Sequence, residues 1–299
     1  MVLAAGTLFA VNGTVSRLVL RAGFDETQLT TVRATGAFLG LMVIALATRP
    51  RTLALTRREL PVLVAYGLAG FFFTPLLYFV SISRLGVGIG LLFEYTAPLL
   101  IALWARFVQR QEVRRRLWTG LVLSLLGLAA VANVWGGGDR RLDPVGVAAG
   151  LGAAALLAVY FLVGEKGVRR RDTVSLTGWA FGVAALAGAV VRPWWNFSWS
   201  TLSERSDGWP VWLLCCYVVI GGSIMSYLLI AGALRHLPAT SVSIVAMIEP
   251  VIASAVAWVV LREHLSVVQI AGGALILAGV ALAETARTRQ PDAPEVPVT

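Results

Sequence analysis

Ten runs of mostly apolar residues, each long enough to cross a lipid bilayer as one helix, dominate this chain of 299 residues. A transmembrane α-helix needs about 20 such residues. Because a bilayer offers no water to backbone polar groups, we expect an all-α polytopic membrane protein. The expected spans are residues 2–20, 29–48, 60–82, 86–108, 116–134, 146–164, 174–192, 210–233, 239–261 and 266–284.

Composition excludes the main alternative classes. Hydrophobic residues make up 58% of the chain and charged residues 14%, against about 45–50% and about 25% in soluble domains. A soluble enzyme, a disordered chain and a secreted disulfide scaffold are therefore excluded. The adjacent Cys215 and Cys216 are too few and too close for a disulfide framework, and we expect both to be small buried hydrophobes.

The net charge of +9 comes from short basic clusters between the apolar runs. This pattern lacks the basic stripe with interleaved aromatics that nucleic-acid binding requires, so no nucleic-acid partner is expected. With both termini in the cytoplasm, sixteen of the 25 lysines and arginines fall in inner connections and eight in outer ones. The positive-inside rule therefore predicts a multi-pass protein of the cytoplasmic membrane with both termini inside.

The chain contains an internal repeat. A shift of 152 residues aligns Leu85 with Leu237, Pro98 with Pro250, Arg110 with Arg262, Gly120 with Gly272 and Gly127 with Gly279. The repeated unit would then be five helices, and an odd number reverses the second copy in the membrane. Inverted repeats of this kind are typical of secondary transporters. We expect one unit over residues 1–138, a second over 139–285, and a disordered cytoplasmic tail at 286–299.

The same residues resemble a known family. Residues 248–282, with Glu249-Pro250, the run from Leu261 to Ser266, Gln269, Gly272-Gly273 and Gly279, are similar to the closing helices of the EamA family of the drug/metabolite transporter superfamily. Residues 78–131, with Glu94-Tyr95-Thr96-Ala97-Pro98, resemble the matching part of its first repeat. The first helix departs from the family: it lacks the Trp-Gly pair common there and reads Val11-Asn12-Gly13.

The resemblance implies a particular architecture and function. It implies ten helices in two inverted five-helix repeats, a central cavity and export of small metabolites. Amino acids are favoured as substrates through this resemblance alone. No cofactor is expected.

Two acidic residues, Glu94 and Glu249, fall near the middle of predicted spans. A charge at that depth costs about 2.5–3.5 kcal/mol on insertion scales, so each should face the interior, be paired or be protonated. The repeat shift places Glu249 at position 97, three residues from Glu94 and on the same helix face. We therefore expect both carboxylates to face one central space. A purely structural, hydrogen-bonded role is the alternative.

Pro98 and Pro250 lie close to these carboxylates. Proline has no amide hydrogen and disturbs the carbonyl four residues earlier, which for Pro98 is that of Glu94. Helices broken near the midplane often bind transporter substrates. The alternative is that both prolines only kink helices for packing.

Six further residues complete the predicted substrate-binding set. Arg33, within the second span, can hold a substrate carboxylate or neutralise a glutamate; alternatively, it snorkels to the outer interface. The other five are polar or amphipathic groups that suit a small organic substrate, or that simply pack between helices: Asn12, Tyr78, Tyr95, Trp179 and Tyr227.

No motif predicts an enzyme. Gly136-Gly137-Gly138 is not followed by the lysine and hydroxyl residue of a phosphate-binding loop. The two histidines, His236 and His264, are too far apart for a helical zinc motif, so no metal is expected. The predicted function is a secondary transporter that acts by alternating access, with proton coupling through the two carboxylates as an added hypothesis. A channel-like facilitator and a membrane-embedded lipid-modifying enzyme are the alternatives, and the oligomeric state is open, with a monomer sufficient.

Overall fold

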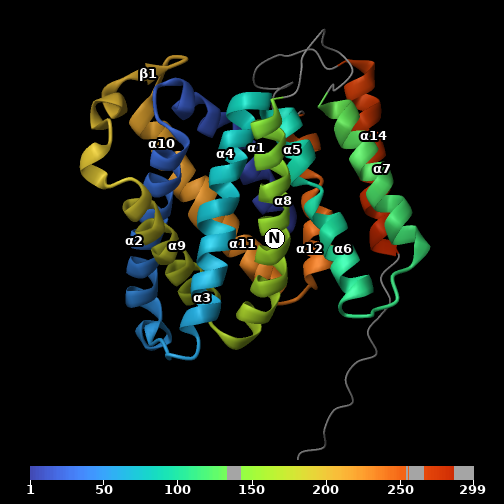
Figure 1. The fold of residues 1–299 in the computed structure, drawn as a ribbon, viewed down its shortest axis with the longest axis horizontal. Helices are drawn as coiled ribbons and strands as arrows, with labels where there is room; N and C mark the ends of the chain where they lie inside the picture. The colour runs from blue at the N-terminus through green and yellow to red at the C-terminus, as the bar shows by residue number, and fades with distance from the viewer. Residues whose placement is uncertain (133–142, 254, 256–265, 286–299) are drawn as a thin grey trace, which may run out of the picture.

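A computed structural model describes residues 1–132, 143–253, 255 and 266–285, and these residues form a bundle of long helices (Figure 1). Eight helical segments in this part of the chain are long and apolar enough to cross a membrane. Residues Ala239–Ala253 form a shorter apolar helix, and α7 (Arg115–Val131) has 17 residues. The chain is therefore a polytopic, mostly helical protein.

The helices follow the apolar runs closely. In the first half the elements are α1 (Val2–Arg21), α2 (Glu26–Thr48), η1 (Pro50–Leu53), α3 (Leu60–Tyr66), η2 (Gly67–Phe73), α4 (Thr74–Leu85), α5 (Val87–Glu94), α6 (Ala97–Phe107) and α7. In the second half they are α8 (Pro144–Arg170), α9 (Thr173–Val191), η3 (Trp194–Asn196), η4 (Trp199–Ser203), β1 (Arg205–Ser206), β2 (Trp209–Pro210), α10 (Val211–Val219), η5 (Ile220–Met225), α11 (Ser226–Leu234), α12 (Ala239–Ala246) and α14 (Val267–Thr285).

Capping residues set several helix starts. Asp25 accepts a hydrogen bond from the backbone amide of Gln28 at the start of α2, and Asp143 accepts one from Gly146 at the start of α8. A side-chain acceptor at this position satisfies an amide that lacks an intrahelical partner. The α8 helix then continues six residues past the expected end at 164, through a last turn that carries the basic residues Arg169 and Arg170.

The third and eighth runs each contain a π-helical stretch. The η2 stretch joins α3 to α4, and η5 joins α10 to α11. In each stretch a hydroxyl side chain bonds a carbonyl five residues earlier, Thr74 to Ala69 and Ser226 to Gly221, both at 2.7 Å. Such π-bulges occur often at functional sites.

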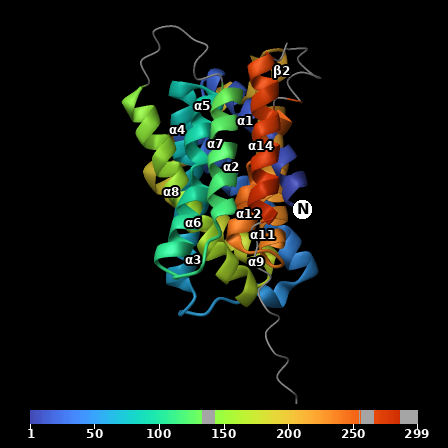
Figure 2. The same ribbon diagram turned by 90° about the vertical axis from the view of Figure 1, so that its right-hand side faces the viewer.

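Helices α7 and α14 lie side by side at one end of the bundle (Figures 1 and 2). A Cβ added at Gly120 would lie 2.5 Å from the carbonyl oxygen of Gly279, and one added at Gly127 would lie 2.5 Å from that of Gly272. The order of contacts reverses between the two helices, so they run antiparallel. Glycine allows this close backbone approach.

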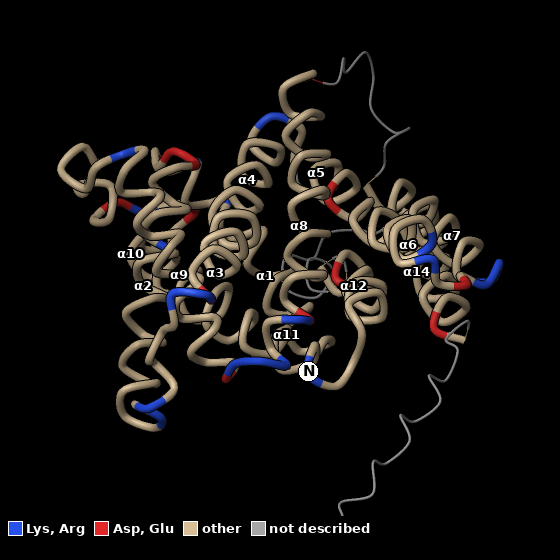
Figure 3. Tube along the Cα trace, turned by 60° about the horizontal axis from the view of Figure 1, so that its bottom comes forward, with Lys and Arg blue, Asp and Glu red and all other residues tan. Residues whose placement is uncertain are grey.

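Charged positions are sparse along the helices and lie mostly near their ends (Figure 3). In the long connection between α9 and α10, β1 and β2 form a short antiparallel pair. Cys215 is buried, but Cys216 is exposed, so the expectation that both are buried is wrong for Cys216. The expected boundary at 138/139, the end of the run 239–261 and the tail 286–299 lie outside the described residues.

Candidate central cavity

Two helices are interrupted at positions that the shift of 152 residues aligns. Helix α5 ends at Glu94, a turn occupies Tyr95 and Thr96, and α6 begins at Ala97. In the second half α12 ends at Ala246, a turn occupies residues 247 and 248, and helix resumes at Glu249. Each interruption lies just before a proline, Pro98 or Pro250, whose missing amide hydrogen favours a break there.

A cavity of about 100 Å³ lies among the helices between these interruptions. Its wall includes seven of the eight predicted substrate-binding residues and one of the two prolines: Asn12, Arg33, Tyr78, Glu94, Tyr95, Tyr227, Glu249 and Pro98. Tyr227 belongs to one cluster of the hydrophobic core, and Tyr78 and Tyr95 belong to the other. The cavity therefore lies where the two core clusters meet.

Glu249 is hydrogen-bonded within the wall of the cavity. Its side chain is 9% exposed, and its Oε2 accepts a hydrogen bond from the Tyr95 hydroxyl at 2.5 Å. Tyr95 belongs to the interruption of the first half, and Glu249 is the first helical residue after that of the second. This bond therefore joins the two broken helices directly.

Glu94 has a different environment, although it lines the same cavity. It is only partly buried, and among the described residues it makes no hydrogen bond or ion pair with another side chain. A carboxylate without a protein partner can bind a cationic group or a proton that enters the cavity. Glu249 is therefore already bonded to a protein group, whereas Glu94 can bind a group that enters the cavity.

Arg33 faces the interior. Arg33 is 3% exposed, and its Nη2 donates a hydrogen bond to the Tyr227 hydroxyl at 3.3 Å. Its guanidinium carbon lies 5.3 Å from the centroid of the Tyr227 ring and 5.7 Å from that of the Phe181 ring. The alternative that Arg33 snorkels to the interface is therefore wrong. Within the described part of the chain Arg33 makes no ion pair.

Asn12 and Tyr78 are buried in the cavity wall. The Asn12 side-chain oxygen has no hydrogen-bond partner among the described groups, and it lies against Gly222, where a Cβ would meet it at 2.0 Å. Glycine at 222 thus leaves room for the Asn12 amide.

Trp179 lies apart from this cavity. Its indole Nε1 donates to the Leu53 carbonyl at 3.2 Å, and its ring packs near that of Phe38. The indole therefore connects α9 to the connection that follows α2. Trp179 is consequently left out of the site proposed below.

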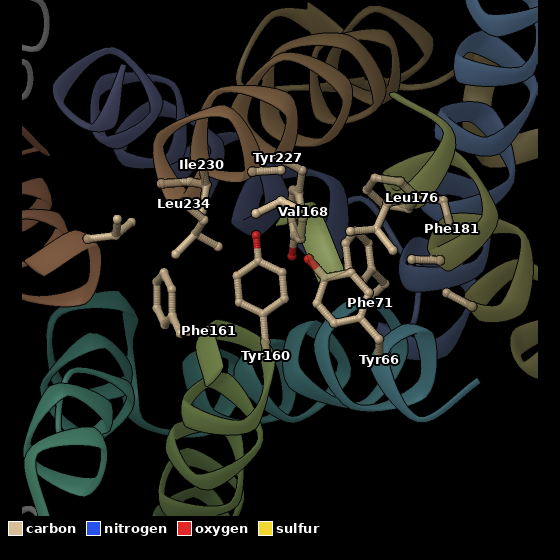
Figure 4. Close-up of a cluster of buried hydrophobic side chains, with 14 of the residues drawn as sticks. Tyr66, Phe71, Tyr160, Phe161, Val168, Leu176, Phe181, Tyr227, Ile230 and Leu234 are labelled. Carbon is tan, nitrogen blue, oxygen red and sulfur yellow. The ribbon is translucent and has the colours of Figure 1, made fainter. Parts of the chain in front are cut away.

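Sequence reasoning did not single out Tyr160, which lines the cavity from α8. Its ring stacks on that of Tyr66, with centroids 5.4 Å apart and planes inclined by 6°. Figure 4 shows the hydroxyl groups of Tyr66, Tyr160 and Tyr227 pointing toward one another. The available signal was a tyrosine in the middle of an apolar run, the feature that singled out Tyr227.

Tyr66 also lines a second pocket of about 170 Å³, whose lining includes Arg58 and Arg171. Arg171 donates to Glu59, to the Ser175 hydroxyl and to the carbonyls of Thr52 and Ala54. It thereby fixes the connection between α2 and α3 against the start of α9. Hydrogen bonds from the Thr56 amide and hydroxyl, with the nearby Arg171 charge, lower the pKa of Glu59 below its usual value.

Among the described residues, no group of three or more histidine, cysteine, aspartate or glutamate side chains is placed to hold a metal ion. The wall of the cavity instead offers carboxylates, a guanidinium, phenolic hydroxyls and one amide. These groups suit binding of a small polar molecule by hydrogen bonds and charge.

Comparison with known proteins gives a consistent result. The model of the EamA-like transporter family matches residues 1–133 and 144–285. An uncharacterized transporter from Archaeoglobus fulgidus is 27% identical over 273 residues, which cover 91% of each chain. The threonine/homoserine exporter RhtA of Escherichia coli K12 is 28% identical over 252 residues, covering 83% of this chain and 80% of the exporter.

A solved crystal structure also shares the fold. It superimposes with a TM-score of 0.75 and covers 95% of this chain and 96% of its own, at 22% sequence identity. This likeness concerns the fold alone.

Proposed function

Because the chain belongs to the EamA-like transporter family, we propose that it is a secondary transporter that exports small metabolites such as amino acids through the central cavity. The observation that carries the proposal is the convergence of Glu94, Glu249 and Arg33 on one buried cavity. Charged groups at membrane depth are expensive and mark substrate or ion pathways. The relatives named as threonine/homoserine exporters support amino acids and the outward direction.

The proposed architecture is ten transmembrane helices in two five-helix repeats that cross the membrane in opposite senses. The antiparallel glycine contacts of α7 and α14 support it, because Gly120 and Gly272 are repeat partners, as are Gly127 and Gly279. A two-fold axis in the membrane plane would convert the contact of Gly120 with Gly279 into that of Gly272 with Gly127, and both contacts are present. The matched interruptions before Pro98 and Pro250 are a second support.

Alternating access follows naturally from such an arrangement, since two similar halves can rock around a fixed central site. The bond between Tyr95 and Glu249 lies at that centre. Glu94, which has no side-chain partner within the described structure, is the better candidate to carry a proton or to meet a cationic group of the substrate. Proton coupling through the two carboxylates is part of this proposal.

The proposed setting is the cytoplasmic membrane, with both termini inside and a monomer as the working unit. The excess of lysine and arginine in alternate connections supports this orientation. The lipid bilayer and the small-molecule substrate are the proposed partners.

Counterflow in proteoliposomes tests the proposal. Vesicles preloaded with an unlabelled compound should transiently accumulate the same labelled compound if the protein is a carrier. The panel contains labelled amino acids, polyamines, nucleosides and small drugs. Saturable counterflow for at least one class supports a transporter. Flux that neither saturates nor shows counterflow contradicts it and favours a channel.

A further inference from the structure

We propose that Arg33, Tyr160 and Tyr227 form a subsite for the carboxylate of the substrate, so that the cavity takes a zwitterionic α-amino acid in one orientation. This inference rests on the proposed transport function and adds to it the residues that hold the substrate carboxylate and the orientation of the substrate in the cavity. It also gives a role to Tyr160.

The first support is a buried cation that no carboxylate contacts directly. Arg33 is 3% exposed and, within the described structure, makes no ion pair. Its contacts are the Tyr227 hydroxyl and the faces of two aromatic rings. A buried charge is expensive unless it is paired. A carboxylate that enters the cavity would supply the missing pair and could bind the guanidinium at two points.

The second support is a set of unused donors beside this guanidinium. The Nε of Arg33 is buried and has no hydrogen-bond partner among the described groups. The buried hydroxyls of Tyr160 and Tyr66 lie close to each other but make no hydrogen bond of regular geometry there. The hydroxyls converge with that of Tyr227 (Figure 4). A carboxylate only accepts hydrogen bonds, whereas a guanidinium only donates them. Tyr160 and Arg33 line the cavity directly, and Tyr66 lies behind Tyr160.

The third support is the apolar wall around these donors. The Phe71 ring lies 4.7 Å from the Tyr227 ring and the Phe181 ring 5.2 Å from it, centroid to centroid. Both phenylalanines are fully buried. Few competing water molecules can reach such a site, and charge-assisted hydrogen bonds are stronger there than in water.

The acidic part of the cavity completes the match. Glu94 has no protein partner in the described structure and can receive an ammonium group, while Glu249 is bonded to Tyr95. A wall with one free carboxylate and one unpaired guanidinium complements a molecule that carries both charges. It suits a dicarboxylate or a polyamine less well.

The test is competition against labelled L-threonine counterflow in proteoliposomes, together with the ligand-induced rise in melting temperature of the purified protein. The competitors are L-threonine, L-threoninamide, which lacks the carboxylate, and N-acetyl-L-threonine, which lacks the ammonium group. Wild-type protein should bind L-threoninamide at least about tenfold more weakly than L-threonine, since hydrogen bonds to charged groups dominate this subsite.

Tyr160→Phe is the decisive variant because it removes one hydroxyl and keeps the ring. It should weaken the binding of L-threonine by about tenfold and leave the binding of L-threoninamide within about twofold of wild type. Tyr217→Phe is the matched control, because the Tyr217 hydroxyl donates to the Leu8 carbonyl at 3.0 Å and Tyr217 does not line this cavity. It should leave the binding of both ligands unchanged.

The outcomes separate the two proposals. If L-threonine shows counterflow but L-threoninamide competes equally well, or if Tyr160→Phe weakens both ligands equally, the subsite is wrong and the transport function stands. If wild-type protein shows neither counterflow nor a melting shift with any amino acid, amino-acid transport itself is wrong and the subsite falls with it.

Discussion

The Tyr95 hydroxyl donates to Glu249 at 2.5 Å across the centre of the bundle, and both residues are buried. Tyr95 lies in the interruption of one broken helix, and Glu249 directly follows the interruption of the other. The bond therefore connects the two halves of the chain at the point where each helix loses its regular backbone bonding. Its loss should be felt both in stability and in the arrangement of the cavity.

Tyr95→Phe removes this bond and leaves the ring in place. A buried acceptor that loses its donor costs about 1–3 kcal/mol, so we expect a lower melting temperature for the variant in detergent. Tyr217→Phe is the control, because it also removes one tyrosine hydroxyl bond, here to the Leu8 carbonyl, at a half-buried site. Equal melting temperatures for wild type and Tyr95→Phe would show that the bond contributes nothing to the folded state.

Glu94→Gln and Glu249→Gln test proton coupling. The glutamine side chain keeps the size of glutamate but cannot bind and release a proton. We expect transport driven by a pH gradient to fall in both variants. Counterflow without a gradient should weaken in Glu94→Gln, because the Glu94 carboxylate is also the proposed contact for the ammonium group of the substrate. The Glu94 variant should also keep its stability, because Glu94 has no side-chain partner in the described structure. Gradient-driven flux at wild-type levels in both variants would refute coupling through these residues.

Tyr66→Phe and Tyr160→Phe should each raise stability, even though the second should impair substrate binding. Both hydroxyls are buried, neither makes a hydrogen bond of regular geometry among the described groups, and both rings are packed. Removing an unsatisfied buried hydroxyl while keeping the ring should raise the free energy of unfolding by about 1 kcal/mol or more. A higher melting temperature with weaker binding indicates a site that sacrifices stability for function. A lower melting temperature in both variants would indicate that the hydroxyls already have partners, for example water.

The sequence predicted the positions of the helices and that Glu94 and Glu249 face one central space, because both follow from the pattern of apolar runs and charges. Apolar runs of bilayer length must become helices, and a charge within such a run must face the interior. Trp179 and Tyr160 could not be sorted in this way. Each is an amphipathic ring in an apolar run, and only the packing of α9 and α8 decides that one meets the Leu53 carbonyl and the other the cavity.

The π-helical stretches were also beyond sequence reasoning. Residues 60–82 read as one continuous helix, and the extra residue in the turn depends on the contacts of the bundle. A Cβ at Gly70 would lie 2.5 Å from the Tyr160 ring, and one at Gly67 would lie 2.7 Å from Val183. These approaches involve α8 and α9, which are distant in sequence.

Adjacent glycines in α14 offer a matched test of the contact with α7. A Cβ at Gly272 would lie 2.7 Å from the Gly127 carbonyl oxygen, whereas the nearest atom to a Cβ at Gly273 is 3.7 Å away on Val251. We expect Gly272→Ala to destabilise the protein by about 1–3 kcal/mol, the range for overpacked contacts. Gly273→Ala should be neutral or slightly stabilising, because alanine favours helix. Melting temperatures in detergent would compare them, and equal effects would contradict the close crossing.

The last prediction follows from the proposed inverted topology. The shift of 152 relates residues 112 and 264, and five helices in each proposed repeat would place them on opposite sides of the membrane. In a background with Cys215 and Cys216 replaced by serine, Glu112→Cys should resist an impermeant thiol reagent added to intact cells, and His264→Cys should react with it. Inside-out vesicles should reverse the pattern. Labelling of both cysteines from the same side would contradict the inverted repeat and with it the alternating-access mechanism, whereas the family membership would stand.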